Sequence, residues 1–421
     1  MTGPTFPPSP SAARLRTLDR MRGLAVMGIL LMNVVAFSMP EAAYFNPRAW
    51  GGESPADLAV WALAFLFVDG KMRGLFALLF GAGMVLMLER TEADPAAARA
   101  RQLARSLWLG LFGLAHYLLL WWGDILALYA VVGLLALPLA DRSPATLAKL
   151  ALLAFALHFL ILLSLVLGIH QAEGLAAAAG APAERIASFG RLLDSIGRPG
   201  SAALMQDVAL HRGPWSALVA DKARHIGEWM SSALHYSTFD TLGFMLLGMA
   251  MLKSGFLTGA WPRTRYRALA LLGFAAGLPP LAALAFLAWT SGFAPVPTFD
   301  IVFAWSFPFR VPLAIALAAL AIPSAGGERA GGFAARVEAV GRLSLSNYLG
   351  TSLLMTGLFY GWGFGLFGHL SRAQAYALVP AVWALMLLWS PLWVGRFRHG
   401  PMEWLWRSLT RLRPQPMRRR R

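Results

Sequence analysis

The sequence predicts an all-α membrane protein, a polytopic bundle of about ten transmembrane helices with both termini in the cytoplasm. Of its 421 residues, 57% are hydrophobic and only 14% are charged, whereas soluble domains carry about 25% charged residues. The hydrophobic residues gather in runs that are long enough to cross a bilayer. The chain also contains no cysteine, so we expect no disulfide framework and no thiolate chemistry.

The first predicted span covers residues 22–39 and follows a Pro- and Ser-rich tail, 1–15, that we expect to be disordered. At about 100° per residue, Asp19, Arg22 and Asn33 lie within roughly 60° of one another on one helix face. Polar groups at membrane depth are costly unless they face protein or a wet cavity. We therefore expect this face to line a site.

Residues 16–169 are predicted to form an N-terminal membrane bundle of five spans. The aromatic segment 55–70 is short for a span, so we interpret it as an interfacial or re-entrant helix that ends before Lys71 and Arg73. Glycine-rich sequence in span 2 favours close helix packing. Spans 2 to 5 are predicted at residues 74–88, 104–122, 125–140 and 147–169.

Residues 170–236 form a polar region with Gly and Pro breaks, which we predict to be an extracytoplasmic loop region. A C-terminal membrane bundle follows over 237–410, and a basic tail over 411–421. An amphipathic helix at 332–342 is expected to lead into span 9. Spans 6 to 10 are predicted at residues 237–252, 266–289, 299–322, 343–361 and 375–395.

The distribution of Lys and Arg sets the predicted orientation. With the N-terminus inside, the inner segments carry 26 of the 37 basic residues, as the positive-inside rule requires. The net charge of +16 therefore indicates a membrane protein oriented by the positive-inside rule and not a nucleic-acid-binding protein. We expect the protein in the bacterial cytoplasmic (inner) membrane, in contact with anionic lipid and not with nucleic acid.

The motifs of common soluble enzymes are absent. The sequence contains no HExxH, GxSxG or P-loop pattern, and no metal site is expected. Gly363, Gly365 and Gly368 spell GxGxxG, but they lie in a short loop between two spans with no strand before them, so a nucleotide fingerprint is excluded.

Several titratable residues lie at membrane depth and are candidates for function. His116 in span 3 precedes Asp124, and His235 precedes Asp240 by about one turn. Either histidine, with its neighbouring carboxylate, is a possible general base because its ordinary pKa lies near 6.5. We interpret His158, which stands alone among apolar residues, as a satisfied structural histidine.

Three further polar residues occur in the C-terminal spans. Asp300 and Arg310 share span 8 but lie far enough apart that each needs its own partner. Asn347 begins span 9, where a capping and packing role is as well supported as a catalytic one.

Six sequence blocks resemble a known bacterial inner-membrane family, called domain of unknown function 418. The match extends from about Arg16 to Thr410 and implies a multi-span membrane protein. The blocks appear in this order: LDRMRGLAVMGILLMNVVAF, PEAAYFNP, GLFALLFGAGM, WWGDILALYAVVGLL, GRLSLSNYL and GPMEWLWRSLT.

The opening block is also similar to a wider superfamily of membrane acyltransferases, which includes the acyltransferase-3 and heparan-α-glucosaminide N-acetyltransferase groups. Their first span begins with a similar Asp-x-x-Arg-Gly, here Asp19 to Gly23. Acyltransferase-3 proteins usually have His where this chain has Asn33, and the acetyltransferase group has Asn there. The acetyl-accepting His proposed for the latter group corresponds to Tyr44, so this chain lacks the expected base of both groups.

The resemblance implies acyl transfer from a cytoplasmic acyl-CoA to a sugar or another hydroxyl or amine acceptor. Arg16, Arg20 and Arg22, with Asp19 beside them, lie at the inner end of span 1 and suit the CoA phosphates. The alternative for these arginines is a positive-inside anchor, which we favour for Arg20. Lys71 and Arg73 are candidates for binding an oxyanion or an anionic acceptor. The remaining site candidates are Asn33 and the two His–Asp pairs given above.

Two other function classes stay open. A transporter of a small or lipid-like substrate would use the same intramembrane polar residues as a pathway, although the sequence shows no matching pair of Gly- or Pro-broken segments. A non-catalytic binding or assembly protein would use the 170–234 loop instead. The acyl donor, the acceptor and the oligomeric state are not determined by the sequence.

Overall fold

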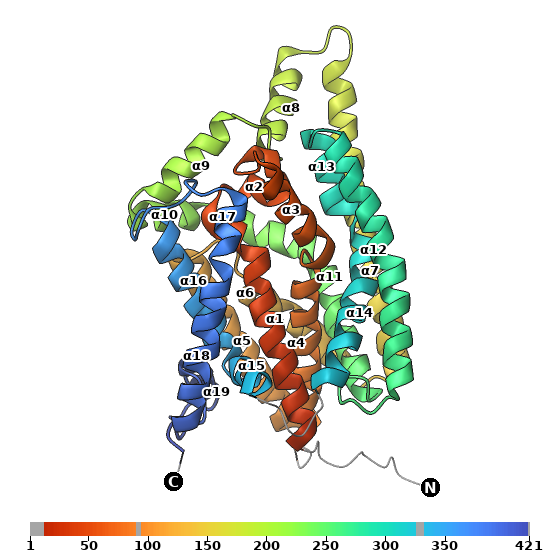
Figure 1. Ribbon diagram of the computed structural model, residues 1–421, viewed down its shortest axis with the longest axis vertical. Helices are drawn as coiled ribbons and strands as arrows, with labels where there is room; N and C mark the ends of the chain where they lie inside the picture. Colours follow the sequence, from red (N-terminus) through yellow and green to blue (C-terminus); the bar gives the residue numbers. More distant parts are fainter. Residues whose placement is uncertain (1–11, 90–93, 326–331, 420–421) are drawn as a thin grey trace.

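The computed structural model describes residues 12–89, 94–325 and 332–419, and within these ranges the secondary structure consists of helices joined by turns and loops (Figure 1). The only pairing of extended residues in this part of the chain is an isolated bridge between Phe397 and Arg418. The long helices run side by side along the long axis, and both chain ends lie at the same end of the molecule. The predicted all-α bundle is confirmed.

The first half of the chain, as far as residue 177, forms seven α-helices and two short 3-10 turns in its described part. They are α1 (Ala12–Ser38), α2 (Glu41–Phe45), the 3-10 turn η1 (Pro47–Ala49), α3 (Pro55–Phe67), α4 (Lys71–Glu89), α5 (Pro95–Leu119), α6 (Leu126–Ala136), the 3-10 turn η2 (Leu137–Leu139) and α7 (Pro144–Ala177).

The second half begins with short helices at the end of the molecule opposite the termini and returns to the bundle (Figure 1). Its helices are α8 (Ala183–Ser195), α9 (Ala202–Arg212), α10 (Trp215–Arg224), α11 (Ile226–Lys253), α12 (Arg263–Thr290), α13 (Pro295–Asp300), the π-turn η3 (Ile301–Trp305), α14 (Phe307–Ala325), α15 (Gly332–Arg342), α16 (Ser344–Phe359), α17 (Arg372–Ala377), α18 (Val379–Arg396) and α19 (Pro401–Thr410).

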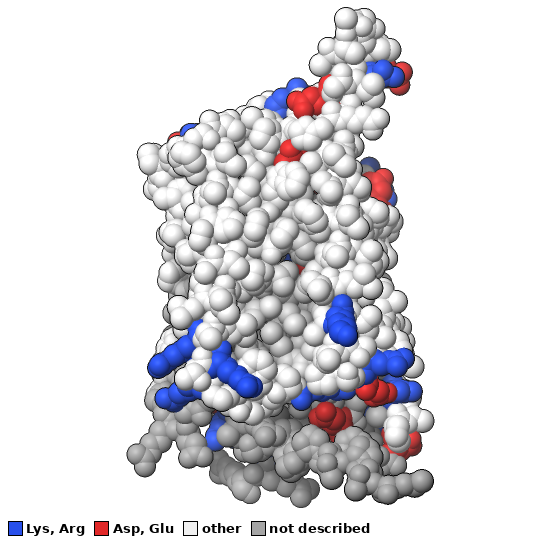
Figure 2. Space-filling view, turned by 90° about the vertical axis from the view of Figure 1, so that its right-hand side faces the viewer, with Lys and Arg blue, Asp and Glu red and all other residues white. Residues whose placement is uncertain are grey.

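Several helices are long and apolar enough to cross a membrane. Among the described residues there are five, and a sixth if the pair Pro295–Trp305 and Phe307–Pro323, bent by 49°, counts as one span. Figure 2 shows a broad white band without Lys, Arg, Asp or Glu on most of its surface, with blue side chains gathered below it. The five are Arg16–Ser38, Pro55–Glu89, Pro144–Ala177, Arg263–Thr290 and Arg372–Arg396.

The count of ten spans and the cytoplasmic orientation of the termini stay predictions. α6 and α16 have only 11 and 16 residues, which is less than the roughly 20 residues that a straight crossing requires. α5 has 25 residues but carries Arg99, Arg101 and Arg105 in its first half. These helices are therefore less distinct as membrane spans than the five given above.

The helix predicted over residues 55–70 is present as α3, and its interfacial or re-entrant position stays a prediction. By length and composition, α3 and α4 together also form one candidate span, Pro55–Glu89. A capping box between Ser54 and Asp57 begins α3, and Gly70 at the junction has a φ of 73°. Glycine adopts this conformation without a Cβ clash, so the chain turns there and continues as α4.

The N-terminal tail is shorter than predicted, because α1 already begins at Ala12; residues 1–11 of the predicted tail lie outside the described residues. The predicted loop region 170–236 contains the end of α7, helices α8 to α10 and the first turns of α11. The amphipathic helix predicted at 332–342 is confirmed as α15. In the basic tail, Arg398 N donates to Met417 O at 2.9 Å, so the tail returns along the end of α18.

The backbones of α4 and α11 approach each other closely in the core. A Cβ on Gly81 would lie 2.1 Å from Met245 O, and a Cβ on Gly248 would lie 1.8 Å from Leu78 O. Both oxygens belong to the backbone, which cannot move aside without shifting a helix. Small residues at membrane helix interfaces permit this approach, so these two glycines set the distance between α4 and α11.

We expect Gly248→Ala to destabilise the protein by about 1–3 kcal/mol, because the new methyl group must push α4 and α11 apart. Thermal unfolding of the purified protein in detergent measures the effect. Gly168→Ala is the matched control, since Gly168 lies in α7 with nothing within 4 Å of its would-be Cβ. Equal melting temperatures for the two variants would contradict the prediction.

Candidate functional site

The candidate site begins with a buried His–Asp pair that joins α5 to the start of α6. His116 Nδ1 lies 2.7 Å from Asp124 Oδ2, and the side chains of both residues are at most 1% exposed. Asp124 Oδ1 accepts a hydrogen bond of 2.8 Å from Ala127 N in the first turn of α6. Gly113 lets α5 approach this turn, because a Cβ there would lie 2.2 Å from Ala127 N.

The second ring nitrogen of His116 is free. Nε2 is buried and has no hydrogen-bond partner among the described residues. Because Asp124 Oδ2 accepts a hydrogen bond from Nδ1–H, Nε2 carries no proton in the neutral ring and is itself an acceptor. A carboxylate behind a histidine fixes the tautomer and stabilises the imidazolium that forms on protonation. The pair is therefore arranged as a general base.

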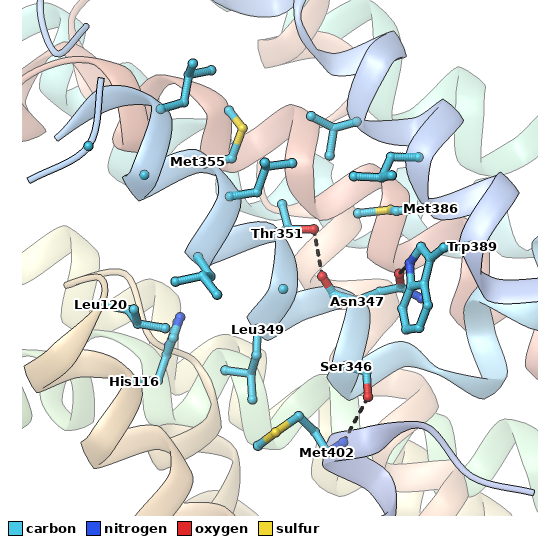
Figure 3. A pocket seen from close by; sticks show the side chains of 18 of the residues that line it. His116, Leu120, Ser346, Asn347, Leu349, Thr351, Met355, Met386, Trp389 and Met402 are labelled. Atoms are coloured by element: carbon cyan, nitrogen blue, oxygen red, sulfur yellow. Dashed lines mark hydrogen bonds between the residues drawn. The ribbon is translucent and has the colours of Figure 1, made fainter. Parts of the chain in front are cut away.

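His116 lines a large apolar groove, which we define by its walls, α5, α16 and α18, and by the start of α19 (Figure 3). The cavity measures about 1230 Å³. Leu, Met and Phe side chains form most of its surface, and Figure 3 shows the few polar side chains, among them Ser346, Asn347 and Thr351, on the α16 side. A groove of this size and polarity suits a hydrocarbon chain.

A second cavity of about 620 Å³ lies between the ends of α1, α4, α5 and α15 and the segment 398–411. We call it the arginine basin, because seven arginines line it and only two carboxylates, those of Asp19 and Glu403. A cavity with this excess of guanidinium groups favours phosphate. The arginines are Arg22, Arg101, Arg105, Arg342, Arg398, Arg407 and Arg411.

The close contact of α1 with α15 forms one wall of the basin. A Cβ on Gly23 would lie 2.1 Å from Val337 O, and a Cβ on Gly341 would lie 1.7 Å from Asp19 O. The glycine of the Asp-x-x-Arg-Gly motif therefore has a packing role. On the same turn, Arg22 donates to Asp19 Oδ1 at 2.9 Å, and both residues face the basin.

The positive charge of the basin affects the pKa of His399, which lies between α18 and α19. Burial lowers the pKa of His399 to about 4, and the positive charges of Arg407, Arg398 and Arg342 lower it further. The imidazole is therefore neutral at pH 7, and the basin keeps its excess of positive charge in its guanidinium groups. Burial raises the pKa of Glu403 above its ordinary value.

The groove and the basin share a wall. Ser346 and Met402 line the groove, and Glu403 lines the basin. Glu403 accepts hydrogen bonds from Leu345 N at 2.7 Å and from the Ser346 hydroxyl at 2.5 Å. Met402 N donates to the same hydroxyl at 3.1 Å. The start of α16 is thus the boundary between an apolar and a cationic cavity.

Other predicted residues of the α1 face lie elsewhere. Arg16 is partly exposed and lines neither of these two cavities. Asn33 is 6% exposed and also lines neither cavity. Arg20 is buried and pairs with Glu338 of α15 at 3.4 Å.

Lys71, Arg73 and Asp240 form part of a separate interior site. Arg73 makes an ion pair with Asp240 of α11 and donates to the Thr241 hydroxyl at 3.3 Å. Lys71 is fully buried and donates to Phe65 O at 2.5 Å. His235 is exposed and packs against the ring of Tyr236, so the structure does not bring it to Asp240.

Comparisons with known proteins agree on one family. The family model described as "Protein of unknown function (DUF418)" matches residues 251–413. The chain is 33% identical to "Uncharacterized protein YeiB" of Escherichia coli (strain K12), over 94% of this chain and 95% of that protein. The chain belongs to the YeiB-like DUF418 family. It is also 28% identical to "Uncharacterized protein YxaH" of Bacillus subtilis (strain 168), over 97% of both chains. No solved structure matches.

Four further polar residues of this DUF418 protein can be compared with what the sequence suggested. Asn347 has a packing role, since it donates to Val340 O and accepts from Trp389 Nε1 at 2.9 Å. His158 is not satisfied, because its Nδ1 is buried without a partner among the described residues. Asp300 and Arg310 have separate partners, as expected: His170 Nε2 at 2.7 Å and Val302 O.

Sequence reasoning missed most of the arginine basin in this family member. Arg101, Arg105, Arg342, Arg398 and Arg407 were counted only as positive-inside charge. They come from three separate segments, so no spacing in the sequence shows that they line one cavity. The useful signal was their excess over acidic residues in the segments predicted to be cytoplasmic.

Proposed function

We propose that this protein is an integral-membrane acyltransferase of the bacterial cytoplasmic membrane, which transfers an acyl group from cytoplasmic acyl-CoA to a hydroxyl or amine acceptor. The observation that carries the proposal is the His116–Asp124 pair, whose free Nε2 is buried beside the apolar groove. The adjoining arginine basin supplies a separate place for a polyphosphate.

In this proposal, the acyl-CoA donor occupies both cavities and crosses the boundary between them at the start of α16. Its phosphates are held by the arginines of the basin, where charge-assisted and bidentate hydrogen bonds favour phosphate oxygens. Its acyl chain occupies the groove, whose Leu, Met and Phe side chains exclude water from the thioester. The thioester carbonyl then lies near the start of α16, where Ser346 and Glu403 meet.

The chemical step uses His116 twice. Nε2 accepts the proton of the acceptor hydroxyl or amine as its oxygen or nitrogen attacks the thioester carbonyl carbon. The tetrahedral intermediate then collapses, the carbon–sulfur bond breaks, and the CoA thiolate takes the proton from Nε2. Asp124 stabilises the imidazolium between the two transfers. The products are the acyl ester or amide and free CoA.

Binding and turnover of acetyl-, propionyl- and longer acyl-CoA by the protein in nanodiscs test this function, followed by mass spectrometry and by release of free CoA. We expect Arg22→Ala to weaken acyl-CoA binding by about 10- to 100-fold, because a charged hydrogen bond to phosphate contributes roughly 1.5–3 kcal/mol. The measurement is a titration of each variant with radiolabelled acyl-CoA.

Arg263→Gln is the control for lost positive charge, because Arg263 is exposed at the start of α12 and lines neither cavity. Its affinity for acyl-CoA should equal that of the unaltered protein. If the folded protein binds no acyl-CoA of any chain length, the acyltransferase proposal is wrong.

One observation favours transport as the second candidate. The break between α3 and α4 at Gly70 lies against Arg310, in the first turn of α14 after the 49° bend. Two interrupted helices that meet at buried charges are typical of substrate sites in transporters. Uptake or efflux of substrate by proteoliposomes, without consumption of acyl-CoA, would distinguish this function from acyl transfer.

A further inference from the structure

Three cations, two of them buried and one half-buried, surround the junction of α3 and α4, apart from the groove and the basin. They are Lys71 at the start of α4, Arg310 in the first turn of α14 and Arg372 at the start of α17, and we call them the interior cation cluster. Asp69 lies among them, close enough that its carboxylate interacts electrostatically with all three. Lys71 and Arg372 are 0% and 2% exposed.

None of the three cations has a carboxylate at salt-bridge distance in the part of the chain that the structure describes. Each instead donates to a backbone carbonyl: Lys71 to Phe65 O at 2.5 Å, Arg310 to Val302 O, and Arg372 to Ala43 O at 2.5 Å. The nearby carboxylate of Asp240 is already paired with Arg73.

This arrangement leaves positive charge without compensation. A guanidinium group does not lose its proton in a protein, and a carbonyl dipole does not neutralise a full charge. With Lys71 protonated, the three cations exceed the two carboxylates within electrostatic reach, those of Asp69 and Asp57, by one positive charge. A buried charge without a counter-ion is strongly unfavourable, so the site favours a bound anion.

The cluster also has donors that are not used. Arg310 Nε and Arg372 Nε are both buried without a hydrogen-bond partner. The Arg310 side chain lies over Gly70, whose would-be Cβ is 2.8 Å from Arg310 Cδ. The phenol groups of Tyr44 and Tyr376 lie close to Asp69 and add hydroxyl donors.

We propose that the interior cation cluster is a binding site for the anionic group, a carboxylate or a phosphate, of a small molecule, held by Lys71, Arg310 and Arg372. The site is distinct from the arginine basin, because none of its residues lines that cavity. It does not depend on acyl transfer: the same site would serve the acceptor of an acyltransferase or the substrate of a transporter.

The test is thermal unfolding of the full-length protein in detergent, with sodium phosphate, sodium acetate or sodium chloride added at equal ionic strength. A ligand that binds only the folded state raises the melting temperature. We expect phosphate or acetate to raise it by about 2–4 °C more than chloride does. This extra rise should disappear in Arg310→Gln and in Lys71→Met, which is a second variant in case the first fails to fold.

Two control variants show which arginines cause the extra rise in melting temperature. Arg263→Gln removes an exposed arginine and should keep the extra rise with both phosphate and acetate. Arg101→Gln removes an arginine of the phosphate-binding basin, so it can lower the response to phosphate but should keep the response to acetate. Without added phosphate or acetate, Arg310→Gln should melt at or above the temperature of the unaltered protein, because it removes an uncompensated charge. No extra rise in the unaltered protein, or an extra rise with acetate that is lost in Arg101→Gln but kept in Arg310→Gln and Lys71→Met, would overturn the proposal.

Discussion

Replacing His116 with alanine is expected to lower acyl transfer by about 10²- to 10⁴-fold, which is the usual contribution of a positioned general base. His116 is the only member of the His–Asp pair that lines the apolar groove, so an acceptor in the groove would lose its proton acceptor. Binding of acyl-CoA should change little, because the basin arginines remain. Single-turnover release of CoA, measured beside equilibrium binding, separates the two effects.

Two variants accompany His116→Ala. Asp124→Asn should also reduce turnover, because the amide can donate to Nδ1 and thereby shift the proton to Nε2. His158→Ala is the matched control: His158 is another buried histidine with a free nitrogen, but it packs against Phe307 away from the groove. Equal turnover by the His116→Ala and His158→Ala variants would exclude His116 as the base.

Replacing Asp240 with alanine is expected to destabilise the protein by about 3–5 kcal/mol, because it leaves Arg73 charged and unpaired in the interior. Asp240 has a side chain that is 2% exposed, and that of Arg73 is 22% exposed. The backbone of Arg73 is itself held by a hydrogen bond of 3.1 Å from the Tyr129 hydroxyl. Thermal and SDS-induced unfolding in detergent measure the loss.

The double variant Arg73→Met, Asp240→Leu tests the physical reason for that loss. Replacing both members of a buried pair with apolar side chains is often neutral or stabilising, so the double variant should recover most of the stability. Asp141→Ala gives the comparison at Arg99, because the side chains of that ion pair, Arg99 and Asp141, are 56% and 68% exposed. If Asp240→Ala and Asp141→Ala cost the same, burial is not the source of the effect.

Much of the fold was predictable from composition and periodicity. The apolar runs predicted membrane helices because a lipid environment requires that every backbone polar group be satisfied within a helix. α15 was predicted with the bounds 332–342 that the structure gives it. The joining of α3 to α4 was not predictable, because the direction of the chain on either side of Gly70 depends on what α4 packs against.

The candidate site was predictable only in part. The distance of eight residues between His116 and Asp124 shows in the sequence, and the structure joins their side chains. For His235 and Asp240, five residues apart on one helix, the sequence suggested a similar pair. Asp240 instead meets Arg73, which lies 167 residues away in the chain, and such a long-range partner has no local signal.

The sequence by itself determined the all-α class, the membrane environment and the DUF418 resemblance, because these depend on composition and on residues that are close together in the chain. Only the tertiary structure decided which polar residues share a site. Arginines from distant segments line one basin, and Lys71, Arg310 and Arg372 meet around Asp69. The physical reason is that helix packing places side chains by close backbone contacts, such as those at Gly23 and Gly248, and not by their separation in sequence.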